Sequence, residues 1–270
     1  MADIRAGGRS IGETFRQLRQ QRRIGLVAFI PAGYPDLATT AAVLPALEAG
    51  GANVIEIGFP FSDPIADGPT IQAAFTEALA RKLKVSEIFA TVASVRQRVS
   101  VPLVAMISYS IVFRFGLERF VAAAKAAGFD GLILPDLPPP EAQRTCDIVR
   151  AGGLDTILLV APTTAKDRRA EIANLCSGFV YYLSVSGITG ERDKLPADLA
   201  DNLRQLRGIT DKPLCVGFGI HRREQVQQLA GFADGAIIGT AFVKRMQKHL
   251  AEGPAGIAQA VEEYASELMR

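Results

Sequence analysis

The sequence predicts an α/β protein, a closed (β/α)8 TIM barrel with an extra N-terminal helix. Eight short apolar segments alternate with amphipathic segments of helical period, and no linker or change in composition interrupts the 270 residues. The apolar segments are continuous instead of alternating with polar residues, which indicates strands buried on both faces of a parallel sheet. Eight such β–α units fit the length of one barrel, so we expect a single domain over residues 1–270.

The predicted strands are, in order, 26–32, 53–58, 102–109, 131–136, 156–162, 179–185, 213–219 and 235–243. Helical patterns lie between them, for example at 115–128 and 223–233, and several end near a Gly, a frequent residue just beyond a helix C-terminus. A doubly wound open sheet is the competing fold. It requires a glycine-rich phosphate turn after the first strand, and AGYPD at 32–36 does not have that pattern.

A further helix is predicted before the first strand. Ser10 and Glu13 have the spacing of a capping box, and Ile11, Phe15 and Leu18 fall on one helical face. We expect this face to lie against the barrel while the arginines of the segment face water. A basic arm that binds a partner is the alternative.

Composition and charge exclude several classes of function. The net charge of +2 and the pI near 8.5 are too small to indicate binding to nucleic acid or to an anionic membrane. The cysteines are odd in number and widely spaced, which indicates buried free thiols in a reducing compartment. No apolar segment is long enough to span a membrane, and the N-terminus lacks the apolar region of a secretory signal. We therefore expect a soluble cytoplasmic protein.

Glycines and a hydroxyl recur where the loops after the last three strands are expected. In a barrel of this kind, ligands bind at the C-terminal ends of the strands, and phosphate is commonly held after strands 7 and 8. Gly190, Gly219 and Gly239 leave backbone N–H groups accessible to an anion, and Thr240 adds a hydroxyl. Glycines that merely form tight turns are the alternative. The long polar loop at 186–196 is suited to be a lid.

Two carboxylates are expected at the same mouth of the barrel. Glu56 interrupts the apolar second strand, and Asp67 lies in the loop that follows. A structural ion pair is the alternative for Glu56, and capping of the helix that begins at Pro69 is the alternative for Asp67. A lone acid on an apolar strand is costly, and two acids in different surroundings can divide the roles of proton donor and anion. The pair indicates acid–base catalysis on a phosphorylated substrate.

Other mechanisms lack the residues that they require. The predicted strands contain no lysine, which argues against a Schiff-base aldolase. Neither histidine has the spacing of a metal site, so no metal is expected. His221 is expected to have a role at the start of the helix that follows it, with contact to a ligand as the alternative, and His249 is expected to be structural or solvated.

Five segments together resemble the tryptophan synthase alpha subunit family. They are FIPAGYPD, IEIGFPFSDPIADGPTIQ, ILPDLP, SVSGITG and VGFGI, and their order and spacing match the family from about Gly25 to Lys248. The resemblance implies a lyase that cleaves indole-3-glycerol phosphate to indole and glyceraldehyde 3-phosphate. It also implies a tryptophan synthase beta subunit as the partner in an alpha2beta2 assembly, with no cofactor here and pyridoxal phosphate only on the beta subunit.

The resemblance assigns roles to single residues. Glu56 and Asp67 match the catalytic acids, while Asp63 and Pro64 match positions near the partner subunit. Positions that bind the substrate fall on Phe29, Ile71, Tyr109, Tyr181 and Thr189, and the positions that bind its phosphate fall on Gly190, Gly219, Gly239 and Thr240.

Three positions depart from the family pattern. Pro31 stands where the family usually has Thr, Pro140 stands where an acid is frequent, and Thr240 replaces a usual Ser. We expect these changes to affect affinity more than activity. The alternatives are a stand-alone lyase that releases indole, a non-catalytic regulatory subunit of beta, and another phosphate-binding barrel, which would leave the SDPIADGP segment unexplained.

Overall fold

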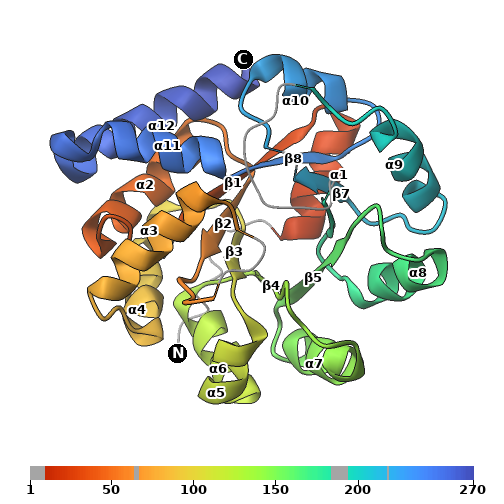
Figure 1. Ribbon diagram of the computed structural model, residues 1–270, viewed down its shortest axis with the longest axis horizontal. Coiled ribbons are helices and arrows are strands. Elements are labelled where there is room, and N and C mark those ends of the chain that lie inside the picture. The colour runs from red at the N-terminus through yellow and green to blue at the C-terminus, as the bar shows by residue number, and fades with distance from the viewer. Residues whose placement is uncertain (1–9, 64–66, 184–193, 218) are drawn as a thin grey trace.

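The strands form a closed barrel, as the computed structural model of residues 10–63, 67–183, 194–217 and 219–270 shows (Figure 1). Each strand is parallel to the next, and the last strand pairs with the first. This confirms the predicted (β/α)8 barrel. The strands are β1 (Gly25–Pro31), β2 (Val54–Gly58), β3 (Leu103–Met106), β4 (Gly131–Ile133), β5 (Asp155–Val160), β6 (Val180–Leu183), β7 (Leu214–Gly217) and β8 (Gly235–Ile238).

Helices surround the barrel on all sides of the view in Figure 1. They are α1 (Ile11–Gln20), α2 (Leu37–Ala49), α3 (Pro69–Ala80), α4 (Val85–Val95), α5 (Tyr109–Phe115), α6 (Leu117–Ala127), α7 (Pro139–Ala151), α8 (Lys166–Leu175), α9 (Leu199–Arg207), α10 (Arg223–Leu229), α11 (Thr240–Lys248) and α12 (Gly253–Met269), with 3-10 turns η1 (Arg96–Arg98) and η2 (Leu250–Glu252). The helix α12 packs against α2 and α11, so the last helix lies beside the helix that follows β1.

The eighth strand ends earlier than residue 243, the end that the sequence predicts, because β8 stops at Ile238 and Thr240 begins α11. The third and fourth strands also end earlier. Tyr109 was expected in the third strand but is the first residue of α5, and Asp136 was expected to end the fourth but lies in the turn after β4. The cause is a set of hydrogen bonds between the two loops. The Asp136 carboxylate accepts from the Ser108 hydroxyl at 2.6 Å and from the Tyr109 backbone N–H at 2.7 Å, which favours the start of a helix over a longer strand.

The helix α1 closes the N-terminal end of the barrel, which confirms the predicted packing. Ile11, Phe15 and Leu18 are buried among the side chains of the barrel interior, and the Ser10 hydroxyl accepts from the Glu13 N–H at 3.2 Å. One arginine of this segment does not simply face water. Arg19 binds the buried carboxylate of Asp234, which also accepts from Arg207 on α9.

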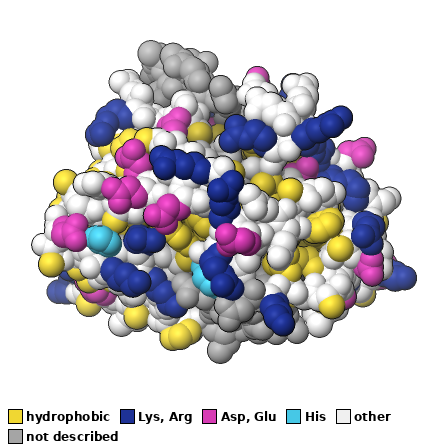
Figure 2. Space-filling model, turned by 90° about the horizontal axis from the view of Figure 1, so that it is seen from above, with side chains coloured by type: hydrophobic (Ala, Val, Ile, Leu, Met, Phe, Trp, Pro, Cys, Tyr) yellow, Lys and Arg dark blue, Asp and Glu magenta, His cyan; other side chains and the backbone are white. Residues whose placement is uncertain are grey.

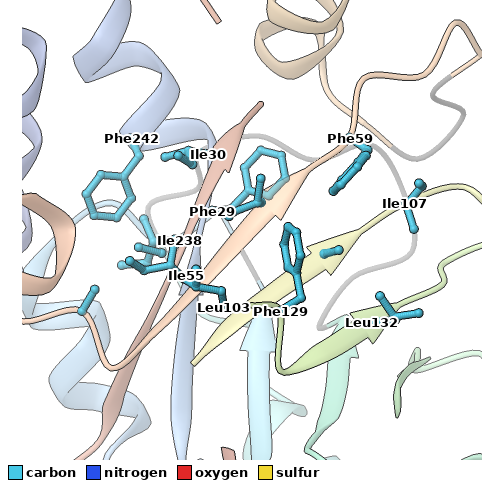
Figure 3. Close-up of a cluster of buried hydrophobic side chains, with 14 of the residues drawn as sticks. Phe29, Ile30, Ile55, Phe59, Leu103, Ile107, Phe129, Leu132, Ile238 and Phe242 are labelled. Atoms are coloured by element: carbon cyan, nitrogen blue, oxygen red, sulfur yellow. The ribbon is translucent and has the colours of Figure 1, made fainter. Parts of the chain in front are cut away.

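The barrel strands separate two apolar cores, which explains why they are apolar along their whole length. One core fills the barrel interior and includes Val27, Val54 and Val104, and the other lies between the strands and the helices. Figure 3 shows part of the outer core, where Phe59 lies beside Phe129 with ring centres 5.9 Å apart. All three cysteines are free and buried, as predicted, at Cys146, Cys176 and Cys215.

The described surface carries charges of both signs. On the face shown in Figure 2, basic and acidic side chains are interspersed, in keeping with the small net charge. Within the described ranges, no helix has the length and apolar character needed to cross a membrane.

Candidate active site

Glu56 is a buried acid inside the barrel. It lies on β2 beside Phe29 of β1 and Val104 of β3, and it shares the inward face of the strand with Val54 because side chains alternate along a strand. Only 1% of its surface is exposed, and among the described residues its Oε2 atom has no hydrogen-bond partner. Burial raises the pKa of Glu56 to about 8, and the nearby charge of Asp67 contributes to this increase. Glu56 is therefore a neutral acid at pH 7 that can donate a proton.

Asp67 is the second acid, and it lies just before α3. The N-cap of that helix is Gly68, and no side chain caps it, so Asp67 does not have the capping role that was the alternative. Its carbonyl accepts from the Gln72 side chain at 2.7 Å, which holds the backbone of the loop. Burial raises the pKa of Asp67 to about 6, so this carboxylate is mostly ionised at pH 7 while Glu56 is not.

Tyr181 lies in the barrel close to both acids. Burial, followed by the charges of Glu56 and Asp67, raises the pKa of its hydroxyl well above the ordinary value. A methyl group added at Gly217 would lie 2.8 Å from the Tyr181 ring, so the glycine provides the space for this side chain. Tyr181 is therefore a neutral hydroxyl beside the two acids.

A cavity of about 330 Å³ opens beside Asp67, at the C-terminal ends of β2, β3 and β4. This volume lies at the lower end of the range of about 300–1,000 Å³ for small-molecule sites. Its walls combine aromatic and aliphatic side chains with a few polar groups, which suits a flat apolar ring with one polar edge. The lining residues are Phe59, Phe61, Asp63, Asp67, Phe75, Met106, Ile107, Ser108, Pro135 and Asp136.

None of the predicted substrate-binding residues that the structure describes lines this cavity, and neither does Glu56. Phe29 packs edge-on against the lining residue Phe75, with ring centres 6.5 Å apart. Its ring occupies space left by two glycines, because a methyl group at Gly58 would lie 2.4 Å from the ring and one at Gly239 would lie 3.2 Å from it. Ile71 is buried on α3, the helix that carries Phe75.

Tyr109 is not among the residues that line this cavity. It is partly exposed on α5, and its ring lies 6.2 Å from the ring of Phe113. Its neighbour Ser108 takes the place in the wall, together with Asp136. Sequence reasoning missed Ser108 as a site residue. The signal that could have found it is its residue type, since a serine between a barrel strand and the next helix is a common N-cap.

Three of the predicted phosphate-binding residues, Gly219, Gly239 and Thr240, follow β7 and β8. Gly239 is the N-cap of α11 and Thr240 is its first residue, so unpaired backbone N–H groups and the positive end of the helix dipole lie there. Gly219 follows β7 with a φ of 61°, a conformation that favours glycine. Its carbonyl lies 3.1 Å from the Nδ1 atom of His221, which lies two residues before α10 and donates its backbone N–H to the Gln225 side chain in the first turn of that helix.

The remaining predictions fall at the rim or outside the described residues. Asp63 is exposed, lines the cavity and accepts a hydrogen bond from Ser62 at 2.7 Å. Pro64, Thr189 and Gly190 lie outside the residues that the structure describes, as does most of the loop at 186–196. In the described part of the chain, no group of three or more His, Cys, Asp or Glu residues could hold a metal ion.

Comparison with known proteins agrees with this geometry. Residues 15–270 match the sequence model of the family described as Tryptophan synthase alpha chain. The tryptophan synthase alpha chain of Picosynechococcus sp. is 44% identical over 261 residues, covering 96% of this chain and 97% of that one, and that of Chloroflexus aggregans is 45% identical over 239 residues, covering 88% and 90%.

Solved structures give the same result. A Mycobacterium tuberculosis tryptophan synthase structure superposes with a TM-score of 0.86 at 35% identity, covering 98% of this chain and 99% of that one. A mutant tryptophan synthase alpha-subunit of Pyrococcus furiosus gives a TM-score of 0.83 at 37% identity, covering 90% and 97%. The chain therefore belongs to the tryptophan synthase alpha chain family.

Proposed function

We propose that Glu56 and Asp67 carry out the family's lyase reaction in this chain, the cleavage of indole-3-glycerol phosphate to indole and glyceraldehyde 3-phosphate. One observation carries the proposal. A buried acid with no hydrogen-bond partner among the described residues has a pKa of about 8, and it lies near a second acid with a pKa of about 6 at the edge of an apolar cavity. This is the arrangement that a proton donor and an anion require at neutral pH.

The two acids have complementary tasks in a retro-aldol cleavage. Glu56 gives its proton to C3 of the indole, which makes that carbon tetrahedral and places positive charge on the ring nitrogen. Ionised Asp67 accepts a hydrogen bond from the ring N–H and stabilises this charge. Glu56, now a carboxylate, takes the proton from the hydroxyl on the adjacent side-chain carbon. The bond between that carbon and C3 then breaks, its electron pair returns to the ring, and Glu56 is again protonated.

The surrounding residues suit the two ends of this substrate. The apolar cavity with Phe59, Phe75 and Met106 fits the indole ring, with Phe29 and Ile71 behind it. The N-terminus of α11 at Gly239 and Thr240, together with the Gly219 backbone, suits the phosphate. We assign Thr189 and Gly190 to closure over Asp67 and the phosphate, and Tyr181 to the pocket, on the family resemblance.

The chain is a subunit by family, and we propose that it works with a tryptophan synthase beta subunit in an alpha2beta2 assembly. We assign no cofactor to this chain and pyridoxal phosphate to the beta subunit. Asp63 at the rim and Pro64 are the residues that we place at the interface with beta. The three buried free thiols support a reducing compartment, and we propose the cytoplasm.

Release of indole from indole-3-glycerol phosphate by the purified chain, measured with and without a beta subunit, tests the function. We expect slow release alone and release at least severalfold faster with beta. Fast release without beta would favour a stand-alone lyase. No release under either condition would overturn the catalytic roles of Glu56 and Asp67 and leave a regulatory subunit.

An exposed phenylalanine supports the position of the partner surface. Phe113 on α5 is 71% exposed, and α5 begins at the catalytic face beside Asp136. Replacing Phe113 by Ser is expected to weaken binding of beta about tenfold or more, since exposed aromatic residues often anchor interfaces. Calorimetric titration with a beta subunit checks the affinity.

The matched control is Leu250→Ser. Leu250 is 41% exposed on η2, which follows the C-terminal end of α11 and so lies away from the catalytic face. Both substitutions should change the free energy of unfolding by no more than about 0.5 kcal/mol. Equal affinity of beta for wild type and Phe113→Ser would place the interface elsewhere.

A further inference from the structure

The cavity beside Asp67 contains a polar pair that the proposed reaction does not use. The Ser108 hydroxyl donates to Asp136 Oδ2 at 2.6 Å, and the Tyr109 N–H donates to Asp136 Oδ1 at 2.7 Å. Ser108 and Asp136 both line the cavity. The Ser108 side chain is buried, with 9% of its surface exposed, and Asp136 is exposed to solvent. Their neighbours in the wall, Met106 and Ile107, are apolar.

An unsubstituted indole ring gives this pair nothing to bind. Its one polar group is the ring N–H, which the proposed mechanism assigns to Asp67. Its six-membered ring presents only C–H groups, and an apolar wall would fit those as well without the cost of desolvating a hydroxyl and a carboxylate. The polar pair is therefore in excess of what the parent substrate requires.

The Asp136 carboxylate retains capacity to accept hydrogen bonds. Each oxygen of the Asp136 carboxylate receives one hydrogen bond from the protein and can accept a second. The Ser108 oxygen lies 2.8 Å from the Ser110 hydroxyl and 3.3 Å from the Ser110 N–H, the latter a long bond for a helix cap. Capping of α5 occupies the Ser108 oxygen, but it leaves the second acceptor position of each Asp136 oxygen to a ligand or to water.

We propose that Ser108 and Asp136 are specificity-determining residues. They adapt the cavity to indole rings that carry a hydrogen-bond donor, a hydroxyl or an amino group, on the six-membered ring. A ring anchored at Asp67 by its N–H extends toward the remaining lining, which includes this pair. The inference rests on the proposed function, because it concerns the same substrate pocket.

Paired substrate analogues test the inference. The probes are indole-3-glycerol phosphate and its hydroxy and fluoro analogues at each free carbon of the six-membered ring. Fluorine is close to hydroxyl in size and donates no hydrogen bond, so the ratio of kcat/KM for hydroxy over fluoro isolates the donor. We expect this ratio to reach about tenfold for at least one ring position in the wild type, as one hydrogen bond to a carboxylate supplies.

Two variants and one matched control locate the effect. Asp136→Asn should reduce the ratio most, Ser108→Ala, which removes the hydroxyl that orients Asp136, should also reduce it, and Ser108→Thr, which keeps the hydroxyl, should preserve it. Each ratio compares two substrates on one protein, so a loss of stability or of active fraction cancels. A ratio near one at every position in the wild type, or one that neither Ser108→Ala nor Asp136→Asn changes, would overturn the inference alone. Failure to cleave the parent compound would instead overturn the proposed function.

Discussion

Replacing Glu56 by Gln is expected to lower kcat for indole release by a factor of about 10²–10⁴, the usual contribution of a positioned general acid–base group. The amide has nearly the shape of the protonated acid but can neither deliver a proton to C3 nor accept one from the substrate hydroxyl. Because the substrate still meets the same cavity and phosphate-binding loops, KM should change far less than kcat. Steady-state release of indole by wild type and variant at saturating beta subunit measures both constants.

The pH dependence of the reaction provides the control. Asp67, with a pKa of about 6, must be ionised, and Glu56, with a pKa of about 8, must be protonated. For the wild type, kcat/KM should therefore rise as the pH increases through about 6 and fall as it increases through about 8. Asp67→Asn should remove the acid limb of this profile. Near-normal turnover of Glu56→Gln, or an alkaline limb that persists in its residual activity, would show that Glu56 does not move the proton.

Much of this fold could be predicted from the sequence because its signals are local. The strands are apolar on both faces since each one separates two cores, and the stripe of Ile11, Phe15 and Leu18 identifies a helix that must cover apolar surface. Glu56 was recognisable for the same reason, as a polar residue within such a strand. Each of these patterns can be recognised from residues that are close together in the sequence.

The features that were missed depend on contacts between distant segments. The end of β3 and the start of α5 depend on Asp136, a carboxylate 27 residues beyond Tyr109, and no local pattern reveals that hydrogen bond. As a result of this hydrogen bond, Ser108 lines the cavity and the predicted residue Tyr109 does not. Similarly, the sequence can place Glu56 and Asp67 at one mouth, but the size of each pKa shift depends on burial by the whole barrel.

Substituting Gln for Glu56 should also change how stability depends on pH. An ordinary glutamate has a pKa of 4.5, and in the folded chain that of Glu56 is about 8, so the folded state holds this proton more tightly than the unfolded state. The stabilisation is fully present below about pH 4.5 and is lost as the pH rises through about 8. Each pKa unit corresponds to about 1.4 kcal/mol, so the loss in the wild type amounts to roughly 3–5 kcal/mol.

The variant cannot ionise at this position and should not suffer this loss. Its free energy of unfolding should be close to that of the wild type at pH 4.5 and should exceed it by several kcal/mol at pH 8.5, as measured by urea denaturation across this range. Glu262→Gln, at an exposed position on α12, is the matched control and should follow the wild type throughout. A difference between Glu56→Gln and wild type that stays constant from pH 4.5 to 8.5 would mean that Glu56 is not held as a neutral acid. A stability gained by removing the carboxyl, together with the loss of turnover, would identify Glu56 as a residue retained for catalysis at a cost to the fold.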